Sequence, residues 1–208
     1  MPIQLNVPYF QKDDAKKLGA RWVPDVGTWV IPDHIVDINP FNAWLPRNGG
    51  TFVKYPYLIA KSQRECWKCH KETPLIGLGA RNYITSVFGS PFSAPIWEMR
   101  NYPVFFVNIK LVDDVIAAIM HDQYPFFKNT YHKTLRKQLW LNTCIHCETI
   151  QGDDYNIDRS YVFGGYLNEK RTLFRGKQME QLPLRFDYYI DSGIYEGEYY
   201  WDGFEEAE

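Results

Sequence analysis

The chain of 208 residues is poor in cysteine: it has four, and they fall into two identical spacings. It lacks any apolar run of about 18 residues, the length that a membrane-spanning helix needs, so we expect no contact with a membrane. Its first residues contain no basic segment followed by an apolar one, which is the pattern of a secretory signal. We therefore expect a cytoplasmic protein, in a compartment where thiols stay reduced.

Short catalytic motifs are missing as well. The sequence has no phosphate-binding loop, no G-x-S-x-G, no H-E-x-x-H and no G-x-G-x-x-G. The pairs of glycines at 77 and 79 and at 164 and 165 are too short to cradle a phosphate and indicate turns. No enzyme class is indicated, and a binding protein is the expectation.

The four cysteines form two C-x-x-C motifs, Cys66 with Cys69 and Cys144 with Cys147. Two such motifs supply the four thiolates of a closed tetrahedral zinc site and leave no position open for water, so the zinc would be structural. Because 74 residues lie between the two motifs, one zinc ion would join distant parts of the chain.

Other uses of the cysteines remain open. Cys66, Cys69 and His70 together match the attachment motif of a c-type haem, which would need an exported chain. A redox dithiol would need the motif at the start of a helix, a context that neither pair has. His70 and His146 lie beside the cysteines; either could replace a cysteine as ligand, but solvated neighbours are the expectation.

The first part of the chain predicts a compact unit with a strand at 5–9, a helix at 13–18, strands at 20–22 and 28–31, and a helical turn at 40–45. Gly19 suits the left-handed position that ends a helix. The pattern L-N-V-P-Y, K-D-D-A-K-K-L-G-A-R-W, W-V-I-P and F-N-A-W-L-P resembles a small uncharacterised domain found in conjugative-plasmid primases and other DNA-processing proteins. The resemblance implies a DNA-handling context and no catalytic residues.

The remainder of the chain predicts strands at 51–61, 74–78, 83–88, 104–109 and 137–142 and a helix at 112–120. The C-W-K-C motif and the later N-T-C-I-H-C with Q-G-D resemble an uncharacterised bacterial zinc-ribbon family. We therefore expect an α+β fold with two domains. Residues 1–48 would form a βαββ-like unit, and residues 51–208 a zinc-ribbon domain with a long insertion between its knuckles and an acidic, aromatic end.

Charge is unevenly spread along a chain with a net charge of −2. Residues 51–150 carry 12 basic and 7 acidic side chains, whereas residues 151–208 carry 6 and 13. Aromatic residues make up 17% of the chain, and cations interleaved with rings suit single-stranded nucleic acid. The predicted contacts are Lys61, Arg64, Trp67, Lys68, Lys133, Arg136, Lys137 and Trp140.

Two alternatives rest on the acidic part of the chain. The segment 187–206 alternates acids with rings, so it could imitate nucleic acid or dock a basic protein partner. Carboxylates could instead bind Mg²⁺ for a nuclease; the candidates are Asp153, Asp154, Asp158, Asp187, Asp191, Glu196 and Glu198. Solvated charged faces are the plainer interpretation of both groups.

Overall fold

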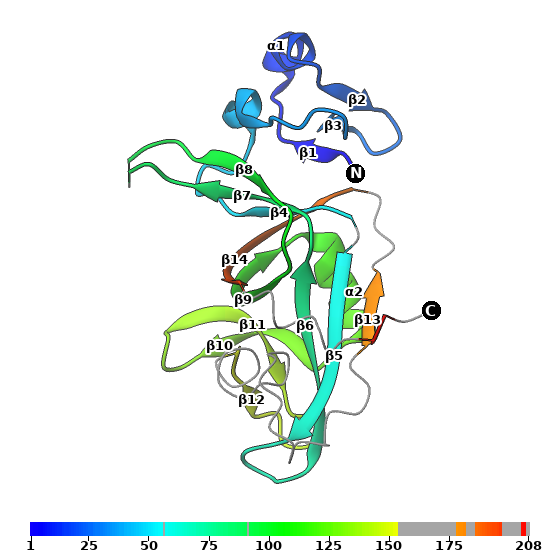
Figure 1. Cartoon of the computed structure of the whole chain (residues 1–208), viewed down its shortest axis with the longest axis vertical. Helices are drawn as coiled ribbons and strands as arrows, with labels where there is room; N and C mark the ends of the chain where they lie inside the picture. The colour runs from blue at the N-terminus through cyan, green and yellow to red at the C-terminus, as the bar shows by residue number, and fades with distance from the viewer. Residues whose placement is uncertain (56, 91, 154–177, 182–185, 197–204, 207–208) are drawn as a thin grey trace.

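The computed structural model describes residues 1–55, 57–90, 92–153, 178–181, 186–196 and 205–206. Two sheets account for most of this part of the chain, and the strand pairings within them are antiparallel except for one (Figure 1). The smaller sheet belongs to the N-terminal unit, and the larger one runs through the rest of the molecule.

The N-terminal unit has a three-stranded sheet in the order β1-β3-β2. Gly19 takes a φ of +99° directly after the short helix, as predicted for a residue that ends a helix. The elements of the unit are β1 (Ile3–Leu5), η1 (Tyr9–Gln11), α1 (Lys12–Lys17), β2 (Arg21–Val23), β3 (Thr28–Ile31) and η2 (Asn39–Trp44).

The larger sheet has the order β15-β13-β5-β6-β9-β14-β4-β7-β8, and β11 joins it to β10 and β12 through a contact with β9. One helix, α2, is capped by the Asp113 side chain, which accepts from the backbone N–H of Val115. The elements are β4 (Thr51–Val53), β5 (Tyr57–Glu65), β6 (Glu72–Ala80), β7 (Tyr83–Val87), β8 (Ile96–Arg100), β9 (Val104–Val112), α2 (Asp114–Gln123), β10 (Phe127–His132), β11 (Lys137–Thr143), β12 (Ile150–Gln151), β13 (Gln178–Gln181), β14 (Tyr188–Glu196) and β15 (Glu205–Glu206).

Two hydrophobic cores stabilise this arrangement. The main core lies among β5, β6, β9 and β14 and is covered by α2, whose Ile116 and Met120 are buried in it. The second core combines side chains of the N-terminal unit with Phe52, Ile84 and Trp97 of the larger sheet. Burial of apolar surface is the dominant favourable term in folding, so the second core also fixes the N-terminal unit to the sheet.

Asparagine side chains strengthen the same junction. Asn39 takes the place of a neighbouring strand at the edge of β8: its Oδ1 accepts from Trp97 N at 2.8 Å and its Nδ2 donates to Trp97 O at 3.0 Å. Asn42 accepts from the Trp97 ring N–H at 2.7 Å and donates to Pro95 O at 2.8 Å. These bonds satisfy backbone groups that an edge strand would otherwise expose.

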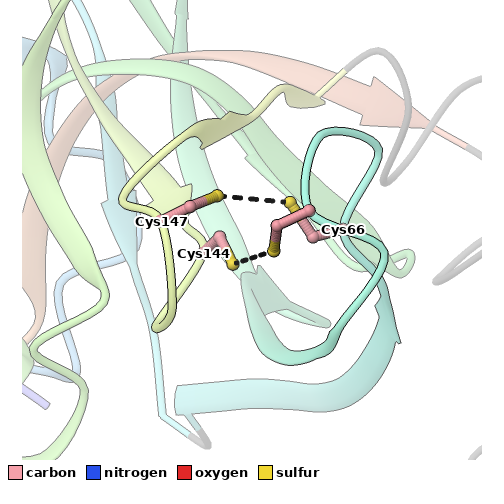
Figure 2. Close-up of side chains that lie close together, drawn as sticks. Cys66, Cys144 and Cys147 are labelled. Carbon is pink, nitrogen blue, oxygen red and sulfur yellow. Dashed lines mark hydrogen bonds between the residues drawn. The ribbon is translucent and has the colours of Figure 1, made fainter.

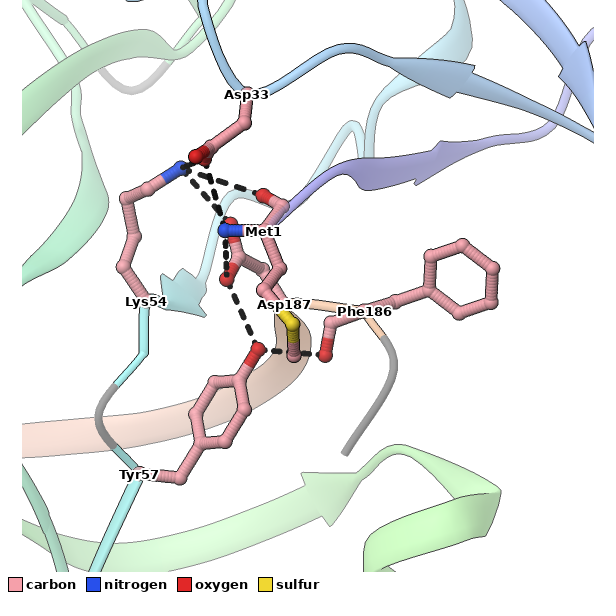
Figure 3. A network of polar contacts seen from close by, with 6 residues as sticks. All are labelled: Met1, Asp33, Lys54, Tyr57, Phe186 and Asp187. Atoms are coloured by element: carbon pink, nitrogen blue, oxygen red, sulfur yellow. Dashed lines mark hydrogen bonds and ion pairs between the residues drawn. The ribbon is translucent and has the colours of Figure 1, made fainter. Parts of the chain in front are cut away.

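A buried carboxylate closes the junction on its other side (Figure 3). The Asp187 side chain has no exposed surface and lies 2.8 Å from Lys54 Nζ and 3.2 Å from the Met1 amine. Lys54 also reaches Asp33 of the N-terminal unit at 3.2 Å. Tyr57 OH lies 2.9 Å from Asp187, and burial together with the charge of Asp187 raises the pKa of Tyr57. The network compensates a charge that would be costly to bury alone.

The expected α+β fold with a βαββ-like unit is wrong, because the described chain is mostly antiparallel β-sheet. Its helices α1 and α2 have 6 and 10 residues. The 74 residues between the cysteine motifs are not an insertion on a small ribbon, since they supply β6, β9 and β11 of the sheet itself. The strands predicted at 104–109 and 137–142 are present within β9 and β11.

The division into domains at residues 1–48 and 51–208 stays a prediction. Among the described residues, no helix is long and apolar enough to span a membrane. The cytoplasmic location is likewise still a prediction.

We predict that Lys54→Met lowers the free energy of unfolding by about 3 kcal/mol, because it leaves the Asp187 carboxylate buried with less compensation. The Met1 amine remains 3.2 Å from Asp187 Oδ1 and still compensates part of its charge. The expected loss of stability is therefore at the low end of the range for broken buried ion pairs. Urea denaturation measures the change. Lys110→Met is the control, since it breaks an exposed ion pair with Asp191 and should cost less than about 1 kcal/mol. Equal losses in both variants would contradict this role of Lys54.

Candidate metal centre and adjoining groove

The first C-x-x-C motif forms the turn of the β5–β6 hairpin. Cys66 N donates to Lys71 O at 2.9 Å, and His70 N donates to Cys66 O at 3.0 Å. The turn closes through a left-handed residue, His70, at φ +58°, and Lys68 N lies 3.5 Å from Cys66 Sγ. This folding places the side chains of Cys66 and Cys69 at the tip of a long hairpin, with a backbone N–H directed at one sulfur.

The second motif has the same geometry between β11 and β12. Cys144 N donates to Thr149 O at 2.9 Å, and Glu148 N donates to Cys144 O at 2.9 Å. Glu148 takes a φ of +57°, and His146 N lies 3.4 Å from Cys144 Sγ. Two knuckles far apart in the sequence thus present Cys144 and Cys147 in the same way as the first pair.

The four sulfur atoms gather at one point between the hairpins (Figure 2). They all lie within 4.8 Å of one another. The Sγ atoms of Cys66 and Cys147 are 3.7 Å apart, and those of Cys69 and Cys144 are 3.6 Å apart. A tetrahedral site with Zn–S bonds of about 2.3 Å requires sulfurs separated by about 3.8 Å. These two separations match that value and all the sulfurs lie within 4.8 Å of one another, so the cluster could hold a metal ion.

Polar side chains form hydrogen bonds with the sulfur atoms. The buried Gln151 donates from Nε2 to Cys66 Sγ at 3.4 Å, and the Thr149 hydroxyl lies 3.4 Å from Cys147 Sγ. Hydrogen bonds from the side chain and backbone of Thr149 lower the pKa of Cys147 to about 6. Burial acts to raise the pKa of Cys66, but backbone N–H donors of its own knuckle outweigh it, and the pKa is lowered. Both effects favour the thiolates of Cys66 and Cys147, the form that binds metal. At Cys69, a backbone N–H donor acts to lower the pKa, but burial and the neighbouring cysteine side chains outweigh it and raise the pKa to about 12.

Asn142 fixes the two hairpins to each other independently of the cysteines. Its buried side chain donates to Ile76 O at 2.8 Å and accepts from Ile76 N at 2.9 Å. The amide therefore pairs with β6 as a neighbouring strand would, although Asn142 belongs to β11. A buried polar group with both hydrogen bonds satisfied specifies one alignment of the hairpins.

The neighbouring histidines lie outside the cluster. His70 Nδ1 lies 2.8 Å from a carboxylate oxygen of Glu65, and His146 Nε2 lies 3.0 Å from Glu72 O. Both rings are exposed. Each C-x-x-C motif lies in a hairpin turn, and the shortest sulfur–sulfur distances join one motif to the other. A redox dithiol would instead lie at the start of a helix.

A groove of about 640 Å³ adjoins the cysteine cluster. One wall carries Arg64 and Trp67 of the first hairpin, and the other comes from the β10–β11 hairpin and the second knuckle. Trp67 Nε1 donates to Ile150 O at 2.9 Å and so spans the two walls, yet 60% of the Trp67 side chain is exposed. The full lining is Arg64, Trp67, Asn108, His132, Thr134, Leu135, Leu141, Ile150, Gly152 and Asp153.

The structure separates the eight predicted nucleic-acid contacts into those in the groove, those close to it and those away from it. Arg64 and Trp67 line the groove. The exposed Lys68 is in the first knuckle, and the exposed Lys133, Arg136 and Lys137 are in or beside the loop whose Thr134 and Leu135 line the groove.

The last two predicted contacts, Lys61 and Trp140, are not among the residues that line the groove. The Lys61 amine lies over the Tyr124 ring at 5.2 Å. Trp140 packs on Phe127 at 6.0 Å between ring centres.

Sequence reasoning missed Asn108 as part of this groove. It lies within β9, in the strand predicted at 104–109, but takes a φ of +50°. Asparagine tolerates the left-handed region better than most residues, so an asparagine inside an apolar strand run was the available signal. Its N–H donates to Asp153 Oδ2 at 2.7 Å.

The predicted nuclease acids do not gather around a metal site in the described residues, where the four cysteines form the candidate metal cluster. Asp187 is buried against Lys54, and Asp191 is paired with Lys110 at 2.9 Å. The side chains of Asp154, Asp158, Glu196 and Glu198 lie outside the part of the chain that the structure describes.

A second cleft, of about 880 Å³, lies between the N-terminal unit and β14. Two of its side chains are held by hydrogen bonds: Trp44 Nε1 donates to Gln11 at 2.7 Å, and Tyr189 OH donates to Gly49 O at 2.6 Å. It lies at the junction of the two sheets, and the cysteine knuckles do not contribute to its lining.

Comparison with known proteins agrees with the first of the two predicted resemblances. Residues 3–46 match a family described as a domain of unknown function (DUF5710). Over 40 residues, 19% of the chain, the sequence is 48% identical to the DNA primase TraC of Escherichia coli, and this stretch spans 3% of the primase. No solved structure matches the chain. The zinc-ribbon resemblance stays a prediction, and the comparisons identify the N-terminal unit as similar to a module of a DNA primase.

We predict that the purified chain contains one zinc ion and that Cys144→Ser abolishes stoichiometric metal. Because binding energy at a structural zinc site is folding energy, the Tm should fall by more than about 10 °C. Elemental analysis and thermal unfolding measure the two effects. His146→Gln is the control: it changes an exposed neighbour of the same knuckle and should retain both metal and Tm. Full metal content in Cys144→Ser would contradict the four-cysteine site.

Proposed function

We propose that this chain binds single-stranded nucleic acid in the groove beside a structural, four-cysteine zinc site, in a DNA-handling context and without catalysing a reaction. The observation that carries the proposal is the exposed Trp67 in the lining of a groove that also contains Arg64 and is bordered by the loop of Lys133, Arg136 and Lys137. The exposed face of an indole is available to an unpaired base, since every base has a π-face.

The position of the tryptophan supports stacking. Its hydrogen bond to Ile150 O fixes the ring at one edge, so little side-chain freedom remains to be lost when a base binds. Trp67 also follows Cys66 directly, and a bound metal would hold the backbone beneath the ring. A single base stacked on such a ring contributes roughly 1–3 kcal/mol.

The charges around the groove suit a phosphate backbone. Arg64 lies on one wall, and the exposed side chains of Lys133, Arg136 and Lys137 flank the opposite one. Residues 51–150, which contain both knuckles, carry an excess of five positive charges. Cations near phosphates release counterions on binding, which makes the affinity dependent on salt.

The N-terminal unit supports the DNA context. It is similar to a part of a protein named as a DNA primase, and it shares a hydrophobic core with the sheet that bears the knuckles. We infer that it joins the groove to nucleic-acid processing, while the activity of the primase is not transferred to this chain.

The alternative that residues 187–206 dock a basic protein partner receives less support than nucleic-acid binding. The described half of the acidic segment is not a free tail, since β14 lies between β4 and β9 in the middle of the sheet. Asp187, Tyr188 and Ile190 are buried there. Side chains held in this way do not present themselves to a basic partner, and residues 197–204 lie outside the described part of the chain.

We predict that Trp67→Ala weakens binding of a labelled single-stranded DNA by roughly 5- to 150-fold, which corresponds to the loss of one stacked base. Fluorescence anisotropy at fixed salt measures the affinity. Phe92→Ala removes a ring that is 99% exposed but is not among the groove residues, and it should leave the affinity unchanged. Equal effects of the two substitutions would exclude the groove as the binding site.

A second experiment tests the cations. The double variant Lys133→Gln with Arg136→Asn should reduce the slope of log K against log salt by about 1.4, or about 0.7 per lost phosphate contact on a single strand. Asparagine suits the positive φ of +52° at position 136. Arg47→Gln changes an exposed arginine outside the groove and should keep the wild-type slope. An unchanged slope in the double variant would remove these residues from the interface.

A further inference from the structure

One residue of the groove lining, Asn108, lies at a local distortion of the sheet. β9 pairs with β14 on both sides of Asn108, but the register shifts between Asp191 and Gly193. At this shift Asn108 adopts a φ of +50°, a conformation that is uncommon inside a strand. Bulges of this kind are frequent beside functional sites, where they redirect a group.

At this bulge the backbone N–H of Asn108 donates to Asp153 Oδ2 at 2.7 Å instead of to a neighbouring strand. The main chain of β9 therefore holds the Asp153 carboxylate in the groove. Asp153 follows the second knuckle closely, and its position also depends on the β11–β12 turn. Asp153, Arg64 and Trp67 line the same groove, which combines an acceptor, a cationic donor and a stacking surface.

A carboxylate in a nucleic-acid groove is repelled by phosphates, so it contributes to binding by accepting hydrogen bonds from a base. Guanine is the base that presents two adjacent donors, N1–H and the N2 amino group, which match the two oxygens of one carboxylate. Thymine presents a single N–H between two carbonyl acceptors. Guanine also carries the acceptors O6 and N7, which arginine reads.

We propose that this groove selects an unpaired guanine, with the base stacked on Trp67 and its N1–H and N2 amino groups donating to Asp153. The inference rests on the proposed function and deepens it, because it names the base that the groove takes. His132 completes the wall: its Nδ1 accepts from Leu135 N at 3.1 Å, so the neutral ring carries its proton on Nε2 as a donor for phosphate or sugar.

The test compares ten-nucleotide single-stranded DNAs that differ at two central positions. One is thymidine throughout, the second has deoxyguanosine at both positions, and the third has deoxyinosine, which lacks the N2 amino group. With the wild-type chain, the guanine oligonucleotide should bind about tenfold more tightly than the thymidine one, and inosine should lose most of the gain. This comparison needs no protein variant.

Asp153→Asn should remove the preference for guanine, and the thymidine oligonucleotide should bind at least as tightly as before, because one charge that repels phosphates is lost. Asp122→Asn, at an exposed site on α2, should preserve the preference. Equal binding of all three oligonucleotides by the wild type would overturn the guanine inference and leave the proposed function standing. A preference that survives in Asp153→Asn, or that inosine retains in full, would overturn the role of Asp153. Binding of none of them would overturn the proposed function and this inference with it.

Discussion

The convergence of four thiols on one point is the constraint on which the rest of the molecule depends. Two hairpin tips, separated by 74 residues, bring their sulfurs within 4.8 Å of one another. Thiolates this close repel one another unless a cation lies between them, and hydrogen-bond donors of the knuckles favour the thiolate form of Cys66 and Cys147. The Asn142 pairing with Ile76 aligns the same two hairpins through neutral hydrogen bonds. The groove depends on this alignment because its lining residues come from both hairpins.

Part of this could be predicted from the sequence. The two C-x-x-C motifs predicted the cluster because one tetrahedral metal site needs four thiolates and the chain has four. Arg64 and Trp67 followed because they lie in or beside the first motif. The fold class was wrong because strand pairing is non-local: the alternating acids and rings after Asp187 resemble a solvated tail, whereas β14 is a central strand. The contribution of Asn108 was missed because it depends on a bulge, and a bulge is set by the register between strands.

The structure also explains how a small module can be built into a larger chain. The N-terminal unit adds Ile3, Phe41 and Trp44 to a core completed by Phe52 and Trp97 of the sheet, and Asn39 covers the edge of β8. A region similar to part of a DNA primase is therefore packed against the sheet that carries the four cysteines. In our account the N-terminal unit links the chain to DNA processing, and the groove beside the cysteines binds the nucleic acid.

The central claim is that metal binding assembles the groove, and the most direct measurement is the affinity of one single-stranded oligonucleotide for the metal-free and the zinc-loaded chain. The account predicts that removal of the metal by a chelator weakens binding strongly, and that one equivalent of zinc restores it. A metal-free chain that binds the oligonucleotide as tightly as the zinc-loaded one would contradict the account.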